Sequence, residues 1–577
     1  MNPGKLALAL LPAVLAACAG QPVKPAQPPA AKPVEAPKPK AEGPKLPNVV
    51  LSEDLLFEFL VAEIAGQRGN IAVASETYVD MAKKTLDPRI AGRALDIALY
   101  SGNMKDALDM AELVSKLDPD SPKAKQALSA LLIHSGNIDG AKPDIEKTLS
   151  RLDPESLSRS LLQLDALFSG QADKKAALQA VESLAKPYLD HPEAHYAIAS
   201  SALRAGESQL ALVEADKALA LRPGWEMAAL LHAQILESGS KESVEPYLTD
   251  FLKQYPKAQG VRLALAKFLV SERKYTEARR EFETLGKLFP ENQDVALAVA
   301  LLSLQLGDTE GAISEFKALL DGGYRNPDLA RYYLGQAEEA AKRGTEALKW
   351  YGSVGKGPQY LPARVNMARI LMAKGDFSGA KRLLKETRTA DAGQRLYLIQ
   401  AEAQLLQEAG RRDAAYALLG RALEAHPDQP ELLYDRAMAA ERLGKIPEAE
   451  QNLKKLIRIQ PGNAQAYNAL GYTLVEHSTR YEEALPLLQK ALELAPEDPY
   501  ILDSMGWLQF RMGHSAPAID YLKRAYAGRR DPEIAAHLVR ALWAEGRHDE
   551  AKSLLDEALK DNPGNAALVR SRKDLMP

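Results

Sequence analysis

The sequence predicts an all-α fold, a solenoid of about 15 helix-turn-helix units, and three features in one register support this prediction. A small residue, nearly always alanine, recurs at a mean spacing of about 34 residues. A glycine often stands five residues before this marker, and a proline often stands twelve residues after it. The markers are Ala74, Ala107, Ala141, Ala177, Ala211, Val244, Ala278, Ala312, Ala347, Ala380, Ala415, Ala449, Ala484, Ala518 and Ala551. The glycines are Gly69, Gly102, Gly136, Gly206, Gly307, Gly375, Gly410, Gly444, Gly513 and Gly546. The prolines are Pro119, Pro223, Pro256, Pro290, Pro427, Pro461, Pro496 and Pro563.

Residues 465–497 show how one unit is built. Gly471 lies in the expected first helix and Ala484 in the expected second helix, where a bulkier side chain would push the two backbones apart. Pro496 ends the second helix, because proline cannot continue a helix. The series Leu470-Gly471, Ala484, Ala491, Pro496 resembles the tetratricopeptide repeat (TPR). The resemblance implies stacked pairs of antiparallel helices that form a superhelix.

The start of the chain is expected to be an export signal, residues 1–17. Lys5 precedes an apolar run, residues 6–15, that is too short to span a membrane as a helix. The box Leu15-Ala16-Ala17-Cys18 then resembles the signal of bacterial lipoproteins, and the resemblance implies that Cys18 becomes the first mature residue and carries the lipid. The alternative is an incidental cysteine in a leader that is not cleaved.

Two further features bear on the location of the protein. Cys18 is the only cysteine, so no internal disulfide can form. Ala19 follows it, whereas in lipoproteins an aspartate at this place is a signal for retention in the inner membrane. The resemblance therefore implies a lipid anchor in the outer membrane that faces the periplasm.

Residues 18–48 are expected to form a proline-rich tether. Nine of the thirty residues from 19 to 48 are proline, and large apolar side chains are scarce, so this segment cannot bury enough surface to fold. At about 3.1 Å per residue it could reach on the order of 90 Å. Its lysines outnumber its glutamates, which is compatible with attraction to an anionic surface or with a plain solvated spacer.

The folded part is expected to start near Ser52, a residue that can cap a helix when acids follow it in the first turn. The repeat phase is least regular between residues 141 and 211 and around residues 352–362, which are candidate bends or joins. The predicted parts are less regular repeats at 49–195, central repeats at 196–360, C-terminal repeats at 361–563 and a capping helix at 564–577.

No pattern predicts catalysis, a cofactor or a metal site. His191-Pro192-Glu193-Ala194-His195 has the ends of a zinc-protease motif, but its glutamate is misplaced and Pro192 marks a repeat boundary. Residues 352–357 resemble a phosphate loop only in composition and follow a helix, so an inter-repeat turn is expected. A net charge of −4 without a basic stripe argues against nucleic acid as a partner.

Aromatic and arginine side chains on the first helices are the predicted protein-binding residues. The TPR resemblance implies that positions 2, 5, 9 and 12 of each repeat face a concave groove. Large rigid rings and arginine are common at protein-recognition hot spots. The alternative is that these rings pack between neighbouring helices. The predicted residues are Tyr332, Tyr397, Tyr434, Tyr472, Tyr500, Trp507, Phe510, Arg511, Arg540 and Trp543.

The order of lipoprotein signal, tether and long TPR array resembles one group of outer-membrane TPR lipoproteins. In that group the lipoprotein is the binding partner of a periplasmic carboxyl-terminal processing protease and also binds its substrates, which are peptidoglycan hydrolases. The resemblance implies a non-enzymatic adaptor whose partners are proteins and whose only membrane contact is the N-terminal lipid. It rests on architecture, because no residue identifies the protease.

The sequence leaves two alternative functions. One is a TPR lipoprotein of an envelope assembly or secretion machine, for example in exopolysaccharide export or pilus assembly, which would bind a membrane channel or secretin. The other is a hydrolase with a hidden site, which the motif search disfavours.

Overall fold

The computed structural model describes residues 46–119, 121–387, 389 and 391–575. These residues form α-helices and two short 3-10 helices, and they contain no strand. The predicted signal peptide, Cys18 and most of the predicted tether lie outside the described residues. The described residues form 15 successive helix pairs followed by the single helix α32, which confirms the predicted all-α solenoid of helix-turn-helix units.

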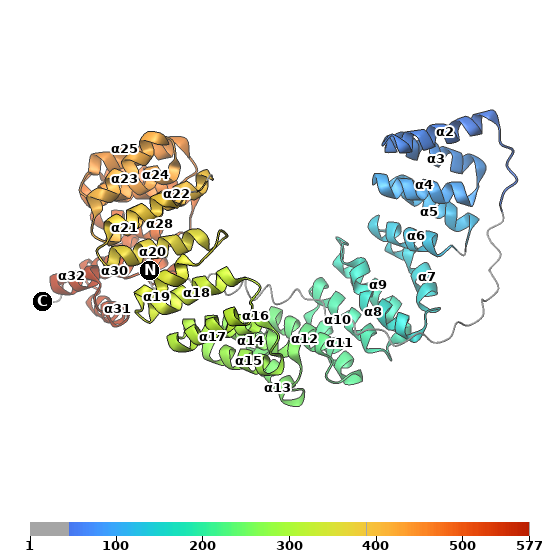
Figure 1. Cartoon of the computed structure of the whole chain (residues 1–577), viewed down its shortest axis with the longest axis horizontal. Coiled ribbons are helices and arrows are strands. Elements are labelled where there is room, and N and C mark those ends of the chain that lie inside the picture. Colours follow the sequence, from blue (N-terminus) through green and yellow to red (C-terminus); the bar gives the residue numbers. More distant parts are fainter. Residues whose placement is uncertain (1–45, 120, 388, 390, 576–577) are drawn as a thin grey trace. The chain divides into compact units, whose positions relative to one another are not determined.

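The chain divides into two compact units between Glu315 and Phe316. Figure 1 shows that, within each unit, consecutive helices lie side by side. The pairs up to this division are α2 (Glu53–Gln67) and α3 (Ile71–Thr85), α4 (Pro88–Ser101) and α5 (Met104–Leu117), α6 (Pro122–His134) and α7 (Ile138–Leu149), α8 (Pro154–Phe168) and α9 (Lys174–Ala185), α10 (Pro192–Ala205) and α11 (Ser208–Leu221), α12 (Glu226–Gly239) and α13 (Val244–Gln254), α14 (Gln259–Ser271) and α15 (Tyr275–Leu288), and α16 (Gln293–Gln305) and α17 (Thr309–Asp321). The short 3-10 helices are η1 (Lys186–Tyr188) and η2 (Lys241–Ser243).

The second unit continues the same pattern. Its pairs are α18 (Pro327–Ala340) and α19 (Gly344–Gly352), α20 (Tyr360–Ala373) and α21 (Phe377–Glu386), α22 (Ala392–Glu408) and α23 (Arg412–Ala425), α24 (Pro430–Arg442) and α25 (Ile446–Ile459), α26 (Ala464–His477) and α27 (Tyr481–Leu494), α28 (Pro499–Arg511) and α29 (Ser515–Gly528), and α30 (Pro532–Ala544) and α31 (His548–Asp561), before α32 (Ala566–Leu575). The two ends of the helical region agree with the sequence. The Ser52 side chain accepts a hydrogen bond from the backbone N–H of Leu55, 3.1 Å away, and so caps α2.

The marker residues of the repeat lie in the second helix of every pair and are buried. Within the second unit, Gly471 and Gly506 provide the matching close approach from the first helix. A Cβ atom on Gly471 would lie 2.6 Å from Cγ of Leu488, closer than real carbon atoms approach. The predicted reason for a small residue at this position, direct contact between two helices, is therefore confirmed.

The predicted turn glycines all adopt a left-handed backbone, which glycine enters at no steric cost. In two of the repeats that carry another residue at this position, the left-handed turn is kept. Arg273 has φ of 59° and Lys342 has φ of 61°. A side chain in this conformation costs about 1–2 kcal/mol, because its Cβ approaches the next carbonyl oxygen.

Replacing Arg273 or Lys342 with glycine is therefore expected to raise the free energy of unfolding by roughly 0.5–1 kcal/mol, because the gain in the turn exceeds the entropy cost of glycine. Urea unfolding followed by circular dichroism measures the change. The reverse substitution Gly410→Arg serves as the matched control and should lower stability by a similar amount. Equal stabilities of all three variants would contradict this account of the turn.

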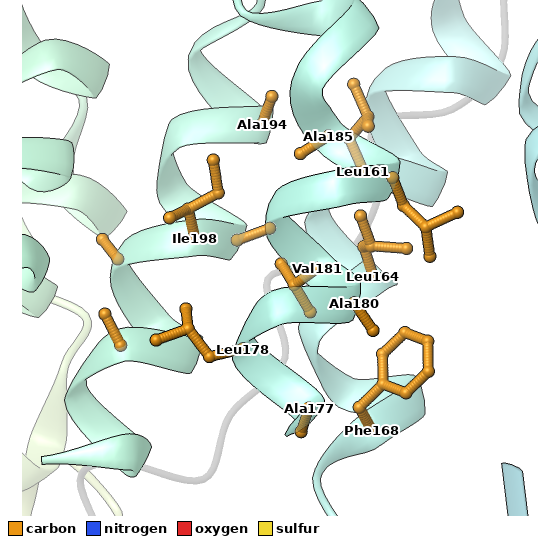
Figure 2. Close-up of a cluster of buried hydrophobic side chains, with 14 of the residues drawn as sticks. Leu161, Leu164, Phe168, Ala177, Leu178, Ala180, Val181, Ala185, Ala194 and Ile198 are labelled. Atoms are coloured by element: carbon orange, nitrogen blue, oxygen red, sulfur yellow. The ribbon is translucent and has the colours of Figure 1, made fainter. Parts of the chain in front are cut away.

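The core is a series of small clusters between neighbouring helices, as expected when each repeat buries its apolar face against the next repeat. Figure 2 shows the cluster in which Phe168 and Leu164 of α8 face Ala177, Ala180 and Val181 of α9. Phe168, Ala180 and Val181 have no exposed surface. This packing lies in the stretch where the repeat phase is least regular, so the irregular spacing still gives a closed core.

In the part of the chain that the structure describes, no helix has both the length and the apolar character needed to cross a membrane.

Candidate functional site

The first helices α26, α28 and α30 bring four ring side chains together, and this group is called the aromatic cluster: Tyr472, Trp507, Phe510 and His537. The rings of Trp507 and His537 are stacked, with centroids 4.2 Å apart and an angle of 15° between their planes. The ring of Phe510, on the same helix as Trp507, also stacks on the Trp507 ring, with centroids 5.1 Å apart. Tyr472 lies 6.4 Å from His537. First helices of successive repeats therefore bring these rings into one contiguous group.

Hydrogen bonds between successive first helices hold this surface in place. The Trp507 Nε1–H donates to Oε2 of Glu476 over 3.0 Å, and Nδ1 of His537 is 2.9 Å from Oδ1 of Asp503. The members of these pairs are separated by 31 and 34 residues, about one repeat. Stacking of repeats places such residues side by side, and their bonds fix the rotamers of the rings before any partner binds.

The surroundings of the aromatic cluster are acidic and partly removed from water. Burial raises the pKa of the Tyr472 hydroxyl, and the carboxylates of Glu476 and Asp503 raise it further. On α24, burial also raises the pKa of Asp435, although the amide of Gln400 donates to its Oδ2 over 2.6 Å and opposes the shift. A low-dielectric acidic surface of this kind strengthens hydrogen bonds to a partner's donors.

The predicted groove residues differ in how much of their surface is exposed. Tyr332 and Trp507 are only 5% and 6% exposed and pack between helices. Tyr397 and Tyr500 are the most open, with 42% of each residue exposed. The half-buried members are Tyr434, Tyr472, Phe510, Arg511, Arg540 and Trp543. Tyr397 and Tyr500 are therefore the predicted residues that a partner can contact without a change in the fold.

The predicted arginines sit beside rings or acids. The Arg511 guanidinium carbon lies 5.8 Å from the Trp507 ring centroid, and its Nη1 is 3.9 Å from Oε2 of Glu476. Arg540 Nη2 is 3.1 Å from Oδ2 of Asp574 in the capping helix. These contacts hold the guanidinium groups of Arg511 and Arg540 in place against neighbouring side chains.

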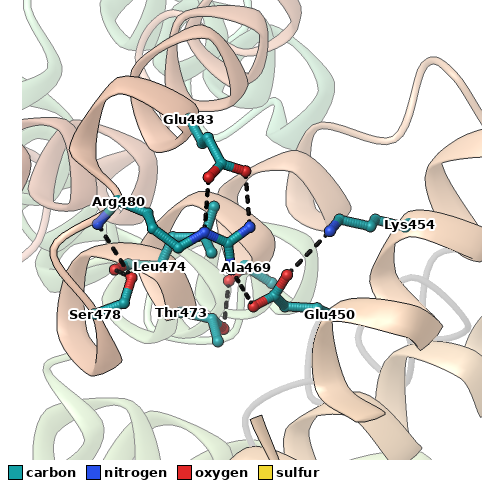
Figure 3. A network of polar contacts seen from close by, with 8 residues as sticks. All are labelled: Glu450, Lys454, Ala469, Thr473, Leu474, Ser478, Arg480 and Glu483. Carbon is teal, nitrogen blue, oxygen red and sulfur yellow. Dashed lines mark hydrogen bonds and ion pairs between the residues drawn. The ribbon is translucent and has the colours of Figure 1, made fainter. Parts of the chain in front are cut away.

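A concave feature of this unit lies between the second helices α25 and α27, with a volume of about 1210 Å³. Ile457, Leu470 and Leu487 are among its apolar lining residues. Figure 3 shows the ion pairs at its rim, where Arg480 Nη1 is 2.6 Å from Oε1 of Glu450 and Nη2 is 2.7 Å from Oε2 of Glu483.

The ion pairs at this rim extend to Lys454, whose Nζ is 3.0 Å from Oε2 of Glu450. Burial opposes the charged form of Glu450, but the hydrogen bonds from Lys454 and Arg480 lower its pKa below the usual range. The charges at this cleft are thus balanced in pairs.

The two segments whose sequences resemble enzyme motifs, residues 191–195 and 352–357, have structural roles in the fold. Both ring nitrogens of His195 have partners inside the protein: Nδ1 is 2.5 Å from Oε2 of Glu214, and Nε2 is 2.9 Å from the carbonyl oxygen of Leu189. His191 stands just before α10. Residues 353–359 connect α19 to α20, which agrees with the predicted inter-repeat turn. The described residues contain no group of three or more His, Cys, Asp or Glu side chains that could hold a metal ion.

The sequence pattern did not indicate some of the residues in these surfaces. His537 and Asp503 are 34 residues apart, about one repeat period, so comparing consecutive repeats could have paired them. The cleft between α25 and α27 had no such signal, because its shape depends on how two second helices diverge.

Comparison with protein-family models gives several matches, and all of them carry the description tetratricopeptide repeat. They cover residues 263–324, 300–360, 331–405, 401–464, 462–531 and 509–572. The matched residues include α26, α28 and α30, which carry the aromatic cluster.

Among curated proteins, the chain is similar to a TPR repeat-containing protein of Pseudomonas aeruginosa, with 34% identity over 491 residues that cover 84% of this chain and 82% of that protein. It is 24% identical over 495 residues to the cellulose synthase operon protein C of Pseudomonas fluorescens, covering 74% of this chain and 36% of that protein. Among solved structures, a thermophilic TPR protein of Thermus thermophilus is 29% identical, with a TM-score of 0.29, over 31% of this chain and 98% of that one.

Proposed function

The chain belongs to the tetratricopeptide-repeat family, and on that premise we propose that it is a non-enzymatic adaptor lipoprotein of the bacterial outer membrane. Its lipid is attached at Cys18, and its helical region reaches into the periplasm on the tether. It binds a carboxyl-terminal processing protease together with the protein substrates of that protease, the cell-wall hydrolases.

The observation that carries this proposal is the ordered aromatic and acidic surface of the second unit. Side chains from successive repeats are linked to one another, as in the pairs Gln400–Asp435, Glu476–Trp507 and Asp503–His537. Such a surface suits recognition of a protein chain, because large rings and polar groups are already held in place. TPR proteins generally bind protein partners, and the comparisons indicate no catalytic family for this chain.

The mechanism is proximity. An adaptor that holds protease and substrate on one chain raises their effective concentration and adds no chemical step of its own. Substrate turnover then depends on the adaptor surface, while the active site remains that of the protease. The order of signal, tether and repeats in the sequence supports the lipid-anchored form of this adaptor.

The test uses the soluble chain that lacks the signal and the lipid-bearing Cys18, residues 19–577, with a purified carboxyl-terminal processing protease and a cell-wall hydrolase. The wild-type adaptor is expected to accelerate hydrolase cleavage. The double variant Tyr397→Ala/Tyr500→Ala is expected to lose at least about tenfold of that acceleration, because each exposed ring offers a hot-spot contact worth up to ~2 kcal/mol.

Ile459→Ala/Leu494→Ala is the matched control, because these side chains are 38% and 37% exposed in the same unit but lie on second helices. It should accelerate cleavage as the wild type does. Full acceleration by the tyrosine variant would exclude these rings as the substrate surface. Absence of any acceleration by the wild type would exclude the protease adaptor.

The second candidate is a component of an envelope assembly or export machine. The similarity to the cellulose synthase operon protein C favours it, although this chain spans about a third of that protein. In that case the soluble chain would capture a channel or secretin from an envelope extract, and no protease would accompany it.

A further inference from the structure

The first helix, α2, is apolar around most of its circumference and is poorly covered. Of its fifteen residues only Ala62 is buried. Phe57 is 68% exposed, and Leu60 and Ile64 are 49% and 47% exposed. Figure 1 shows α2 as the end helix of its unit, where α3 covers one side. An exposed apolar stripe at 3.6-residue spacing is typical of a helix that binds a partner.

A pocket of about 910 Å³ opens beside this stripe, between α2, α3 and the start of α5. This α2–α3 pocket has an apolar floor that includes Phe57, Val61 and Val79. Phe57 belongs both to the pocket and to the exposed stripe, so the two surfaces are continuous.

The rim of the α2–α3 pocket is acidic. Four carboxylates line it against one ammonium group, and they belong to Glu58, Glu76, Asp80 and Asp106, with Lys83 as the cation. Lys83 is itself 3.3 Å from Asp109.

The carboxylates of the rim differ in their partners. Glu58 and Asp80 share the ammonium of Lys84, which is 2.6 Å from each of them. Among the described residues, Glu76 has no basic partner and no side-chain hydrogen bond. The pocket therefore keeps a net negative charge that its own residues do not balance.

A buried hydroxyl provides an independent sign of a ligand. Ser75 lines the α2–α3 pocket, is only 4% exposed, and its Oγ has no hydrogen-bond partner. Buried polar atoms are nearly always bonded, since an unpaired one loses its hydration without compensation. The Ser75 hydroxyl is therefore an unsatisfied polar group in the wall of this pocket.

We propose that the α2–α3 pocket binds a basic amphipathic segment of a protein partner. The aliphatic stem of a lysine or arginine lies on Phe57 and Val61, and its cationic head lies between Glu76 and Asp80. The apolar face of the same segment covers the stripe formed by Phe57, Leu60 and Ile64. The proposal deepens the adaptor function and rests on it for the existence of a partner, while adding a docking site in the first unit.

The charges of the pocket favour a basic protein segment over an anionic lipid surface and over a second copy of α2. An anionic lipid surface would be repelled by the acidic rim, and interfacial helices carry lysine and arginine on their polar face. The residues of α2 include four acids and no base: Glu53, Asp54, Glu58 and Glu63. Two copies of α2 facing each other would therefore bring like charges together, which is unfavourable.

The test measures the binding of a fluorescent 18-residue helix of leucine, lysine and alanine, in amphipathic order, to the mature chain by anisotropy. A scrambled peptide of the same composition and a peptide with glutamate in place of lysine are the negative probes. We expect the amphipathic lysine peptide to bind at least about tenfold more tightly than either, and more weakly as salt increases.

The variant Glu76→Gln/Asp80→Asn is expected to weaken the binding of the lysine peptide about five- to tenfold, because it removes two negative charges from the rim of the pocket. Both side chains are exposed, so the fold should be retained. Glu146→Gln/Glu237→Gln removes two exposed carboxylates of the same unit outside the pocket and should bind as the wild type does.

Equal binding of the ordered and scrambled peptides, or an unchanged affinity of Glu76→Gln/Asp80→Asn, would overturn the proposal. A third arm neutralises the tether by Lys38→Gln/Lys40→Gln/Lys45→Gln in the full mature chain. A tenfold gain in peptide affinity there would identify the chain's own lysines as the occupant and overturn the assignment to a partner. No protease is present in these measurements, so their failure is distinguishable from failure of the adaptor function.

Discussion

Replacing Phe168 with alanine is expected to lower the free energy of unfolding of the first unit by about 3–5 kcal/mol. The ring has no exposed surface and lies against α9 in the cluster of Figure 2. Its removal costs the transfer free energy of the ring and leaves a cavity that helices held on both sides cannot fill.

The adjacent residue is the matched control for this change. Leu167 is 50% exposed on the same helix, and Leu167→Ala is expected to cost less than about 1 kcal/mol. Repeat arrays need not unfold in one step, so hydrogen exchange of the α8 and α9 amides should accompany denaturant unfolding. A loss below about 1 kcal/mol for Phe168→Ala would show that this cluster is not a packed core.

Replacing Gly506 with valine is expected to lower the stability of the second unit by about 1–3 kcal/mol. A Cβ at this position would lie 2.6 Å from Cγ of Leu522 and 3.2 Å from the backbone oxygen of Ala518. Both residues are fully buried, so relief of the clash requires α28 and α29 to separate. Because Trp507 and Phe510 of the aromatic cluster lie on α28, we also expect weaker partner binding.

The control is the same substitution at Gly92 in α4, where a Cβ meets no atom within 4 Å. There valine should change the stability by less than about 0.5 kcal/mol, since glycine and valine are both weak helix formers. Urea unfolding and hydrogen exchange of α28 and α29 measure the difference. If both variants lost the same stability, helix propensity rather than helix contact would account for the glycine at Gly506.

The repeat was predictable because each mark of it acts locally. Ala484 and Gly471 are small because two helices touch there, Gly513 has a left-handed backbone, and Pro496 follows the end of α27. These requirements recur in every unit and depend little on the neighbouring repeats. The helix pairs and their turns therefore follow from the sequence alone.

The binding surfaces were predictable only in part. Trp507 and Tyr500 lie on the same helix at predicted groove positions, yet one is 6% exposed and the other 42%. His537 from the next repeat stacks on Trp507 with ring centroids 4.2 Å apart, whereas Tyr500 has only the Arg529 guanidinium carbon 5.2 Å from its ring centroid and stays open. Exposure is thus set by side chains about one repeat away, which the pattern within a single unit does not contain.

By itself the sequence determined the all-α repeat, its period and its register, because these follow from residue size and backbone preference inside each unit. It also determined the single cysteine and the composition of the tether. Only the tertiary structure decided which aromatic rings are open, that Asp503 meets His537, and that a pocket with an unpaired Ser75 opens beside α2. The physical reason is that these features depend on the distance and angle between stacked helices, which are set by the packing of all their side chains together.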